Sequence, residues 1–159
     1  MIERTLVVLK PDAVQRGLTG TIVRRFEAAG LKIVGMYMTQ IGDALARQHY
    51  ADLEARIGAE AFAAVIDYMR SGPVIAMAIE GDGAVAVVRK LVGATFPSEA
   101  APGTIRGDLC HQGRTGSSKA VANLVHASGA VDEAERELAL WFTSDQFFAY
   151  ERADGAFTV

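Results

Sequence analysis

The chain has 159 residues, half of them hydrophobic, and a formal net charge of −3 at pH 7. This length and composition provide one sizeable core and fit a single domain over residues 1–159. The slightly acidic balance leaves no basic field to attract nucleic acid, and the sequence has no run of Lys and Arg with interleaved aromatic residues. Nucleic acid is therefore not expected as a specific partner.

The cysteine count and the hydropathy of the sequence both indicate the cellular compartment of the protein. Cys110 is the only cysteine, so neither an internal disulfide nor a cysteine-rich zinc site can form, which suits a reducing environment. The chain enters an apolar segment at once, without the basic region and apolar stretch of a secretion signal, and it has no apolar run of membrane-spanning length. We therefore expect a cytoplasmic protein that does not insert into membranes.

The first half of the chain alternates strand and helix patterns. Residues 5–9 are apolar and β-branched, which predicts a strand that stops where Pro11 removes a hydrogen-bond donor. Residues 19–29 carry apolar side chains at helical spacing. Residues 31–40 are typical of a second strand, and residues 43–53 of a second helix.

The second half begins with an alanine-rich helix pattern over residues 59–69. Ser-Gly-Pro at residues 71–73 ends it, and residues 74–79, apolar on both faces, predict a central strand. Apolar spacing predicts another helix over residues 83–91. Residues 93–109 lack periodicity and contain two prolines, which predicts a long, ordered and functional loop.

The end of the chain supplies a last strand and a last helix. Residues 110–120 are polar and rich in Gly and Ser, residues 121–125 are apolar, and residues 131–142 form an amphipathic helix pattern with acidic residues in the first turn. This order of elements predicts an α+β fold, a ferredoxin-like four-stranded antiparallel sheet covered by helices.

His126 directly follows the predicted last strand, and Glu137 lies eleven residues later on the predicted helix. A neutral imidazole is a competent nucleophile, and a carboxylate bonded to its second nitrogen fixes the tautomer and supports the cation formed on attack. The pair can meet only if the helix folds back over the strand. A histidine at the end of an apolar strand also suits a structural role, which this fragment alone leaves open.

If His126 accepts a phosphoryl group, the site needs cations and hydroxyl donors to stabilise the transferred charge. Candidates stand at the predicted ends of elements or in the long loop. Each alone also fits a solvated charge, a helix face or a simple turn. They are Lys10, Tyr50, Arg89, Thr95 and Arg106.

These candidates belong to longer strings that resemble the nucleoside diphosphate kinase family from Glu3 to about Phe142. The most specific string is Pro102-Gly103-Thr104-Ile105-Arg106-Gly107-Asp108. The other similar strings are residues 3–18, 25–33, 68–74, 123–126 and 135–142, together with the spaced Gly81, Val85, Arg89, Gly93, Thr95 and Pro97.

The resemblance implies ping-pong chemistry, in which a nucleoside triphosphate phosphorylates His126 and a nucleoside diphosphate then accepts the group. Glu137 would orient the imidazole, and Ser128 would help to set Glu137. The catalytic residues would be His126, Glu137, Lys10 and Tyr50, and the nucleotide-binding residues Lys10, Phe62, Arg89, Thr95, Arg106 and Asn123. In these roles Lys10 contacts the transferred phosphate and the sugar hydroxyl, Asn123 the sugar, and Arg89, Thr95 and Arg106 the phosphate chain.

The resemblance also implies cofactors and partners. Mg²⁺ would arrive on the nucleotide phosphates, so no cluster of metal ligands is expected in the protein. The partners would be nucleoside diphosphates and triphosphates, and further copies of the chain in a homo-oligomer, usually a hexamer and sometimes a tetramer.

The sequence departs from the family just after the histidine. The family has glycine, serine, aspartate and serine where this chain has Ala127, Ser128, Gly129 and Ala130. The change predicts a weaker cap on the helix that carries Glu137, a loss of about 1 kcal/mol. It also motivates an alternative function, a nucleotide-binding or assembly module with little or no turnover.

Two segments of this chain are longer than the corresponding segments usual in the family. About seven extra residues lie within residues 110–122, where we expect His111 to be solvated and where Arg114 and Lys119 could reach phosphate, although loop charges usually do not. About three extra residues between Tyr50 and Tyr68 place Phe62 beside the base-stacking position, and a core role suits it equally well. Stacking is weakly selective because every base has a π face, so we expect broad base specificity.

Overall fold

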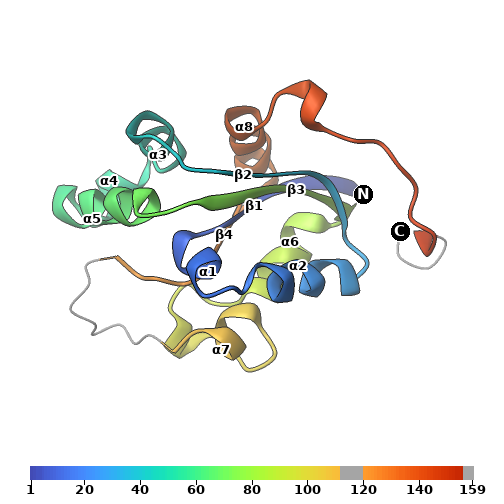
Figure 1. The fold of residues 1–159 in the computed structure, drawn as a ribbon, viewed down its shortest axis with the longest axis horizontal. Coiled ribbons are helices and arrows are strands. Elements are labelled where there is room, and N and C mark those ends of the chain that lie inside the picture. Colours follow the sequence, from blue (N-terminus) through green and yellow to red (C-terminus); the bar gives the residue numbers. More distant parts are fainter. Residues whose placement is uncertain (112–119, 156–159) are drawn as a thin grey trace.

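A computed structural model describes residues 1–111 and 120–155 of the chain. Its centre is a four-stranded antiparallel sheet in the order β2-β3-β1-β4, with helices on both faces (Figure 1). This confirms the predicted α+β fold. The strands are β1 (Ile2–Leu9), β2 (Lys32–Thr39), β3 (Val74–Asp82) and β4 (Val125–Ala127).

The two central strands are buried on both faces. From Thr5 to Leu9 every residue of β1 is buried, as is the first part of β3 from Val74 to Ile79. Strands covered on both sides need continuous apolar runs, which is the pattern that their sequences show. Val8 of β1 pairs with Ala76 on one side and His126 on the other, so β4 continues the sheet beside the buried half of β1.

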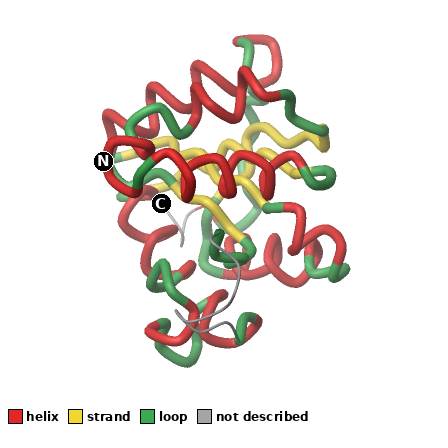
Figure 2. The backbone as a smooth tube through the Cα atoms, turned by 90° about the vertical axis from the view of Figure 1, so that its left-hand side faces the viewer, coloured by secondary structure: helices red, strands yellow, loops and turns green. Residues whose placement is uncertain are grey.

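Helices of different faces pack into two separate cores. On one face the core includes Phe26 and Val88, and on the other it includes Ile66, Leu138 and Trp141. Figure 2 shows the sheet from the side, between these helical layers. The first face carries α2 (Thr19–Ala28) and α6 (Ala84–Val92), and the second carries α3 (Asp43–His49), α5 (Ala59–Arg70) and α8 (Val131–Trp141).

Several short elements were not predicted. The expected loop over residues 93–109 contains a helix that begins where the Thr104 hydroxyl accepts the Gly107 N–H at 3.0 Å. The predicted helix over residues 43–53 is divided near Tyr50. Five-residue helices are too short to show a 3.6-residue period, which is why the pattern missed them. These elements are α1 (Pro11–Gln15), α4 (Leu53–Ile57), α7 (Ile105–Leu109) and the 3₁₀ turns η1 (Pro97–Glu99) and η2 (Ser144–Gln146).

The last strand lies later than predicted. Residues 121–125 were expected as the strand, but β4 begins only at Val125 and includes His126. The reason is Leu124, whose φ of 67° is left-handed and cannot belong to a strand. His126 is therefore held by the sheet and does not follow it.

The chain returns to the sheet after α8. Phe148 donates its backbone N–H to the Val34 carbonyl at 2.7 Å, and the Tyr150 hydroxyl donates to the Ile33 carbonyl at 2.8 Å.

In residues 1–111 and 120–155, none of the helices has the length and apolar character needed to traverse a bilayer.

Candidate active site

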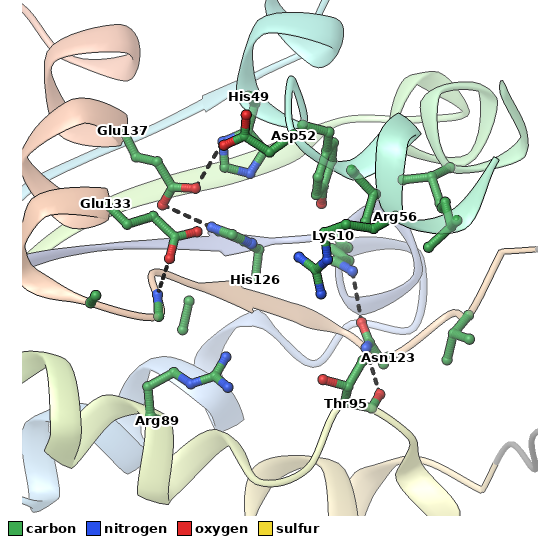
Figure 3. Close-up of a pocket in the computed structure, with 18 of the residues that line it drawn as sticks. Lys10, His49, Asp52, Arg56, Arg89, Thr95, Asn123, His126, Glu133 and Glu137 are labelled. Carbon is green, nitrogen blue, oxygen red and sulfur yellow. Dashed lines mark hydrogen bonds and ion pairs between the residues drawn. The ribbon is translucent and has the colours of Figure 1, made fainter. Parts of the chain in front are cut away.

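A cleft of about 1080 Å³ opens beside β4, between α3, α4 and α8 on one side and α6 with the loop after it on the other (Figure 3). Its lining brings together residues that are far apart in the sequence. Every predicted site residue lies there except Phe62, namely Lys10, Tyr50, Arg89, Thr95, Arg106, Asn123, His126 and Glu137.

Glu137 holds the His126 ring from behind. Its Oε2 lies 2.9 Å from His126 Nε2 and accepts the Ser128 hydroxyl at 2.6 Å. Because Leu138 and Trp141 anchor α8 in the core, the helix folds back over the sheet and brings Glu137 onto β4. A carboxylate acceptor fixes the proton on Nε2, which leaves the Nδ1 lone pair as the nitrogen available to the cleft.

The imidazole is uncharged at neutral pH. Burial, together with the positive charges of Lys10, Arg106 and Arg89, lowers the pKa of His126 to about 3. Burial raises the pKa of Glu137, while His49 and the Ser128 hydrogen bond favour its charged form. A neutral ring with a bonded carboxylate behind it is a prepared nucleophile.

A second histidine backs this pair and was not predicted from the sequence. The Nδ1 atom of His49 lies 3.5 Å from Glu137 Oε1, and it accepts the Trp141 Nε1–H at 3.2 Å. The His49 and His126 ring centroids are 4.2 Å apart at 80°. Burial and His126 lower the pKa of His49 well below its usual value. Its position before Tyr50, at the end of α3, gave no periodic signal for this role.

His49, His126 and Glu137 together resemble a set of metal ligands. The sequence did not predict such a set. One ligand atom each from His49, His126 and Glu137 lies within 4.8 Å of the others. Hydrogen bonds already occupy these atoms, since Glu137 bonds His126 and Trp141 donates to His49. The geometry therefore fits a hydrogen-bonded cluster better than a metal centre.

Lys10 is held in the cleft by hydrogen bonds that link it to Asn123 and the loop after α6. Its Nζ donates to Asn123 Oδ1 at 2.7 Å, and Asn123 Nδ2 donates to the Thr95 carbonyl at 2.8 Å. Burial and the neighbouring Arg106 lower the pKa of Lys10 to about 7. The ammonium group is thus close to losing its proton when no anion is bound.

The Arg106 guanidinium makes more hydrogen bonds to the protein than a side chain that only binds phosphate would need. It donates to the carbonyls of Asn123, Gly93, Ala94 and Val125 at 2.6–3.1 Å. A guanidinium has five N–H groups, so these four bonds leave one for a ligand. Burial and Arg89 lower the pKa of Arg106 to about 10, and it still carries its charge into the cleft.

Further donors line the opening. Arg89 from α6 and Arg56 from α4 reach in from opposite sides (Figure 3). The buried Tyr50 hydroxyl has no hydrogen-bond partner among the described side chains and backbone, and burial raises its pKa, so it remains a neutral donor. The Tyr50 and His126 ring centroids are 6.0 Å apart. Arg56 was missed because its helix has no recognisable period.

Phe62 is a correction to the sequence prediction, because it does not reach the cleft. The ring is 4% exposed and packs in the second core, with the Arg47 guanidinium 5.6 Å from its centroid. It shares the buried stripe of α5 with Ile66 and Met69, at helical spacing. The apolar lining of the cleft instead includes Leu53, Ile57, Ala61, Val65, Phe96 and Val121.

The unusual residues after His126 alter the start of α8. Ala130 is the N-cap and provides no side-chain bond, as expected. Glu133 replaces part of the missing cap by accepting the Gly129 N–H at 2.8 Å. His111 is exposed, in keeping with a solvated loop histidine. Arg114 and Lys119 lie outside the described residues.

Sequence comparisons match the chain that forms this site to one family. The family model described as nucleoside diphosphate kinase covers residues 3–147. A nucleoside diphosphate kinase of Archaeoglobus fulgidus is 49% identical over 154 residues, covering 96% of this chain and 95% of that protein. One of Pyrococcus horikoshii is 50% identical over 151 residues, covering 95% and 92%.

Solved structures agree with the sequence comparisons. A transition state mimic of nucleoside-diphosphate kinase from Borrelia burgdorferi, with bound vanadate and ADP, has a TM-score of 0.95 and 37% identity, covering 99% of this chain and 96% of that one. A halophilic nucleoside diphosphate kinase from Halobacterium salinarum, in complex with CDP, has a TM-score of 0.87 and 44% identity, covering 98% and 97%. Both likenesses extend over nearly the whole chain.

Proposed function

The chain belongs to the nucleoside diphosphate kinase family, and from this premise we propose that its cleft moves the terminal phosphate of a nucleoside triphosphate to a nucleoside diphosphate through a phosphohistidine at His126. The observation that carries the proposal is the state of the ring. Its Nε2 is bonded to the buried Glu137, and its pKa is far below neutrality. The Nδ1 lone pair is therefore the nucleophile.

In the first half-reaction, the Nδ1 lone pair forms a bond to the terminal phosphorus, and the bond from phosphorus to the bridging oxygen breaks. The nucleoside diphosphate leaves with that electron pair. The ring keeps its Nε2 proton and becomes cationic, and Glu137 stabilises this charge at 2.9 Å. In the second half-reaction, a terminal oxygen of the acceptor diphosphate attacks, the P–N bond breaks and the neutral imidazole returns.

The cations of the cleft stabilise the charge that passes along the phosphates. Lys10 contacts the transferred phosphate and the sugar hydroxyl, Asn123 the sugar, and the Tyr50 hydroxyl donates beside His126. Arg56, Arg89 and Thr95 contact the phosphate chain, and Arg106 adds its charge and one remaining N–H. Magnesium would arrive with the nucleotide substrate and would offset part of its phosphate charge.

The base lies against the apolar lining contributed by Leu53, Ile57 and Val121. Aliphatic contacts accept the face of any base and do not read its hydrogen-bonding edge. This supports broad base specificity even though Phe62 does not stack on the base.

We also place the chain in the cytoplasm as a single domain over residues 1–159 that assembles into a homo-oligomer, a hexamer or a tetramer. The single cysteine suits a reducing compartment. Light scattering measures the number of subunits directly, and a monomer would contradict the assembly.

The alternative function, a nucleotide-binding or assembly module with little or no turnover, was suggested by Gly129, Ala130 and the two longer segments. It is disfavoured because the changed residues leave the nucleophile intact. Glu137 still bonds His126, and Ser128 still bonds Glu137. Relatives with the family name also match over nearly the full chain.

The test of the proposed function is labelling with γ-³²P-ATP. The wild-type protein should retain acid-labile, alkali-stable label that unlabelled nucleoside diphosphate removes, and His126→Ala should retain none. His111→Ala, which changes an exposed histidine, is the matched control and should label normally. A folded wild-type protein that binds nucleotide by calorimetry but takes up no label would favour the alternative.

A further inference from the structure

Asp12 connects three parts of the fold without lining the cleft. Its Oδ1 accepts the Tyr68 hydroxyl at 2.5 Å, and its Oδ2 accepts the Leu124 backbone N–H at 3.1 Å. Asp12 lies on α1, Tyr68 on α5, and Leu124 directly before β4. One half-buried carboxylate therefore joins a helix from each side of the sheet to the segment that leads to His126.

Leu124 has an unfavourable backbone conformation. Its φ is 67°, and among the described residues it is the only non-glycine with a positive φ. A left-handed leucine is disfavoured because its Cβ approaches the following carbonyl oxygen. Burial of its side chain offsets part of this cost, and hydrogen bonds hold both of its backbone groups. Its N–H donates to Asp12, and its carbonyl accepts the Lys10 N–H at 2.8 Å.

The left-handed conformation of Leu124 determines where the Asn123 side chain points. The Leu124 N–H belongs to the peptide that joins the two residues, so Asp12 holds one side of that peptide. The carbonyl on its other side accepts the Val125 N–H at 2.8 Å and the Arg106 Nε–H at 3.1 Å. From this position the Asn123 side chain accepts from Lys10 Nζ at 2.7 Å and donates to the Thr95 carbonyl at 2.8 Å. A rotation of the peptide would carry the amide away from both partners.

We propose that Asp12 is a positioning residue for nucleotide binding: its two hydrogen bonds hold the left-handed turn at Leu124 and thereby aim Asn123 at the bound nucleotide. The inference rests on the proposed function, because Asn123 is the group through which Asp12 acts. Asp12 itself touches neither substrate nor His126.

A different route of action would be charge. The Asp12 carboxylate favours the charged form of Lys10, whose pKa burial and Arg106 lower to about 7. Asp12→Asn separates the two routes, because the amide oxygen can accept the Leu124 N–H while its nitrogen donates to the Tyr68 oxygen. Asp12→Ala removes the hydrogen bonds and the charge together.

The experiment is a double-mutant cycle between Asp12→Ala and Asn123→Ala, read as kcat/KM for a nucleoside diphosphate acceptor. Asp12→Ala should lower kcat/KM about tenfold, mainly through KM, as expected for losing a hydrogen bond to a charged group. Asp12→Asn should stay within about threefold of wild type at pH 6, and its alkaline decline should begin at a lower pH because the carboxylate that favours the charged form of Lys10 is gone. In the Asn123→Ala background, Asp12→Ala should cost nothing further.

Two variants serve as controls. Asp67→Ala removes an exposed aspartate beside Tyr68 and should leave kcat/KM unchanged. Tyr68→Phe removes only one bond of Asp12, and its loss of about threefold should also vanish in the Asn123→Ala background. It keeps the cycle interpretable if thermal unfolding shows that Asp12→Ala does not fold.

Additive losses in the cycle would overturn the inference, since Asp12 would then act independently of Asn123. So would an Asp12→Asn variant as weak as Asp12→Ala at pH 6, because that result assigns the effect to the charge of Asp12 and not to its hydrogen bonds. Both outcomes leave an active wild-type enzyme and the proposed function intact. A wild type that is not phosphorylated would contradict the proposed function instead.

Discussion

The two nitrogens of His126 meet contrasting surroundings. Behind Nε2 lies a buried acidic cluster, defined as Glu137 with Ser128, His49 and Trp141, in which each neighbour bonds or closely contacts the next. On the Nδ1 side lies an open cleft whose cations lower the pKa of the ring. Hydrogen bonds hold the acidic cluster in place without substrate, whereas Lys10, Arg89 and Arg106 face a cleft in which an anionic substrate can pair with them.

This contrast separates two tasks of a phosphate carrier. The acidic cluster keeps one proton on one nitrogen through both half-reactions, so no proton has to leave the ring. The cleft changes its occupant from triphosphate to diphosphate between the half-reactions. Variants of the acidic cluster should therefore change kcat, and variants of the cleft should change kcat and KM together.

The largest effect is expected at the cleft. Lys10→Ala removes a buried cation that the proposed reaction places on the transferred phosphate, and kcat/KM should fall about 10²–10³-fold. Lys90→Ala, an exposed lysine on α6, is the matched control and should be unchanged. Steady-state exchange between ATP and a second diphosphate measures both, and a Lys10→Ala enzyme with wild-type kcat/KM would remove Lys10 from the reaction.

On the acidic side, Glu137→Gln keeps an acceptor for Nε2–H but removes the charge that balances the cationic ring. We expect kcat to fall about 10–100-fold with little change in KM, since a hydrogen bond to a charged group is lost. Pre-steady-state phosphorylation of the enzyme measures the step itself. A rise in KM at constant kcat would mean that Glu137 serves binding and not the ring.

The pH dependence of kcat/KM should follow the charge of Lys10 in the cleft and not that of His126. The pKa of Lys10 is about 7 in the free enzyme, so its charge is present below pH 7 and is lost above it. The pKa of His126 is about 3, so the nucleophile stays unprotonated in mild acid. We expect kcat/KM to fall up to about tenfold per pH unit above pH 7.

Lys10→Arg should abolish this alkaline decline, whatever its absolute activity, because a guanidinium keeps its proton. A wild-type profile that instead loses activity on the acid side near pH 6.5 would assign the titration to an ordinary histidine.

The smallest effect concerns the helix that carries Glu137. Ala130→Ser provides the missing N-cap of α8 and should stabilise the protein by about 1 kcal/mol, or about 2–4 °C in the unfolding midpoint. Ala139→Ser, at an exposed interior position of the same helix, should not stabilise it. Equal midpoints for Ala130→Ser and wild type would show that the Glu133 bond to Gly129 already completes the cap.

Sequence patterns predicted the parts of the molecule that are long or chemically singular. The central strands are continuous apolar runs, His126 is a polar residue beside an apolar run, and Glu137 lies on the amphipathic helix that follows it. What was missed is short or set by tertiary contact. The strand β4 has three residues and begins where Leu124 turns left-handed, which no side-chain pattern encodes.

Residues of the site that depend on packing were equally hard to predict. His49 becomes part of the acidic cluster only because α3 meets α8, and a single histidine in a helix carries no signal of that contact. Phe62 was considered for the cleft from its aromatic type, but its spacing with Ile66 and Met69 places it on the buried stripe of α5. Position on the helix decides its role, and residue type does not.

The most direct test asks which nitrogen of His126 carries the phosphate. Enzyme labelled with γ-³²P-ATP is digested under alkaline conditions, and the product is separated against standards of the two phosphohistidine isomers. Because Glu137 occupies Nε2, the label should be on Nδ1, and it should be absent from His126→Ala. Label on Nε2 would contradict the division between the acidic cluster and the cleft.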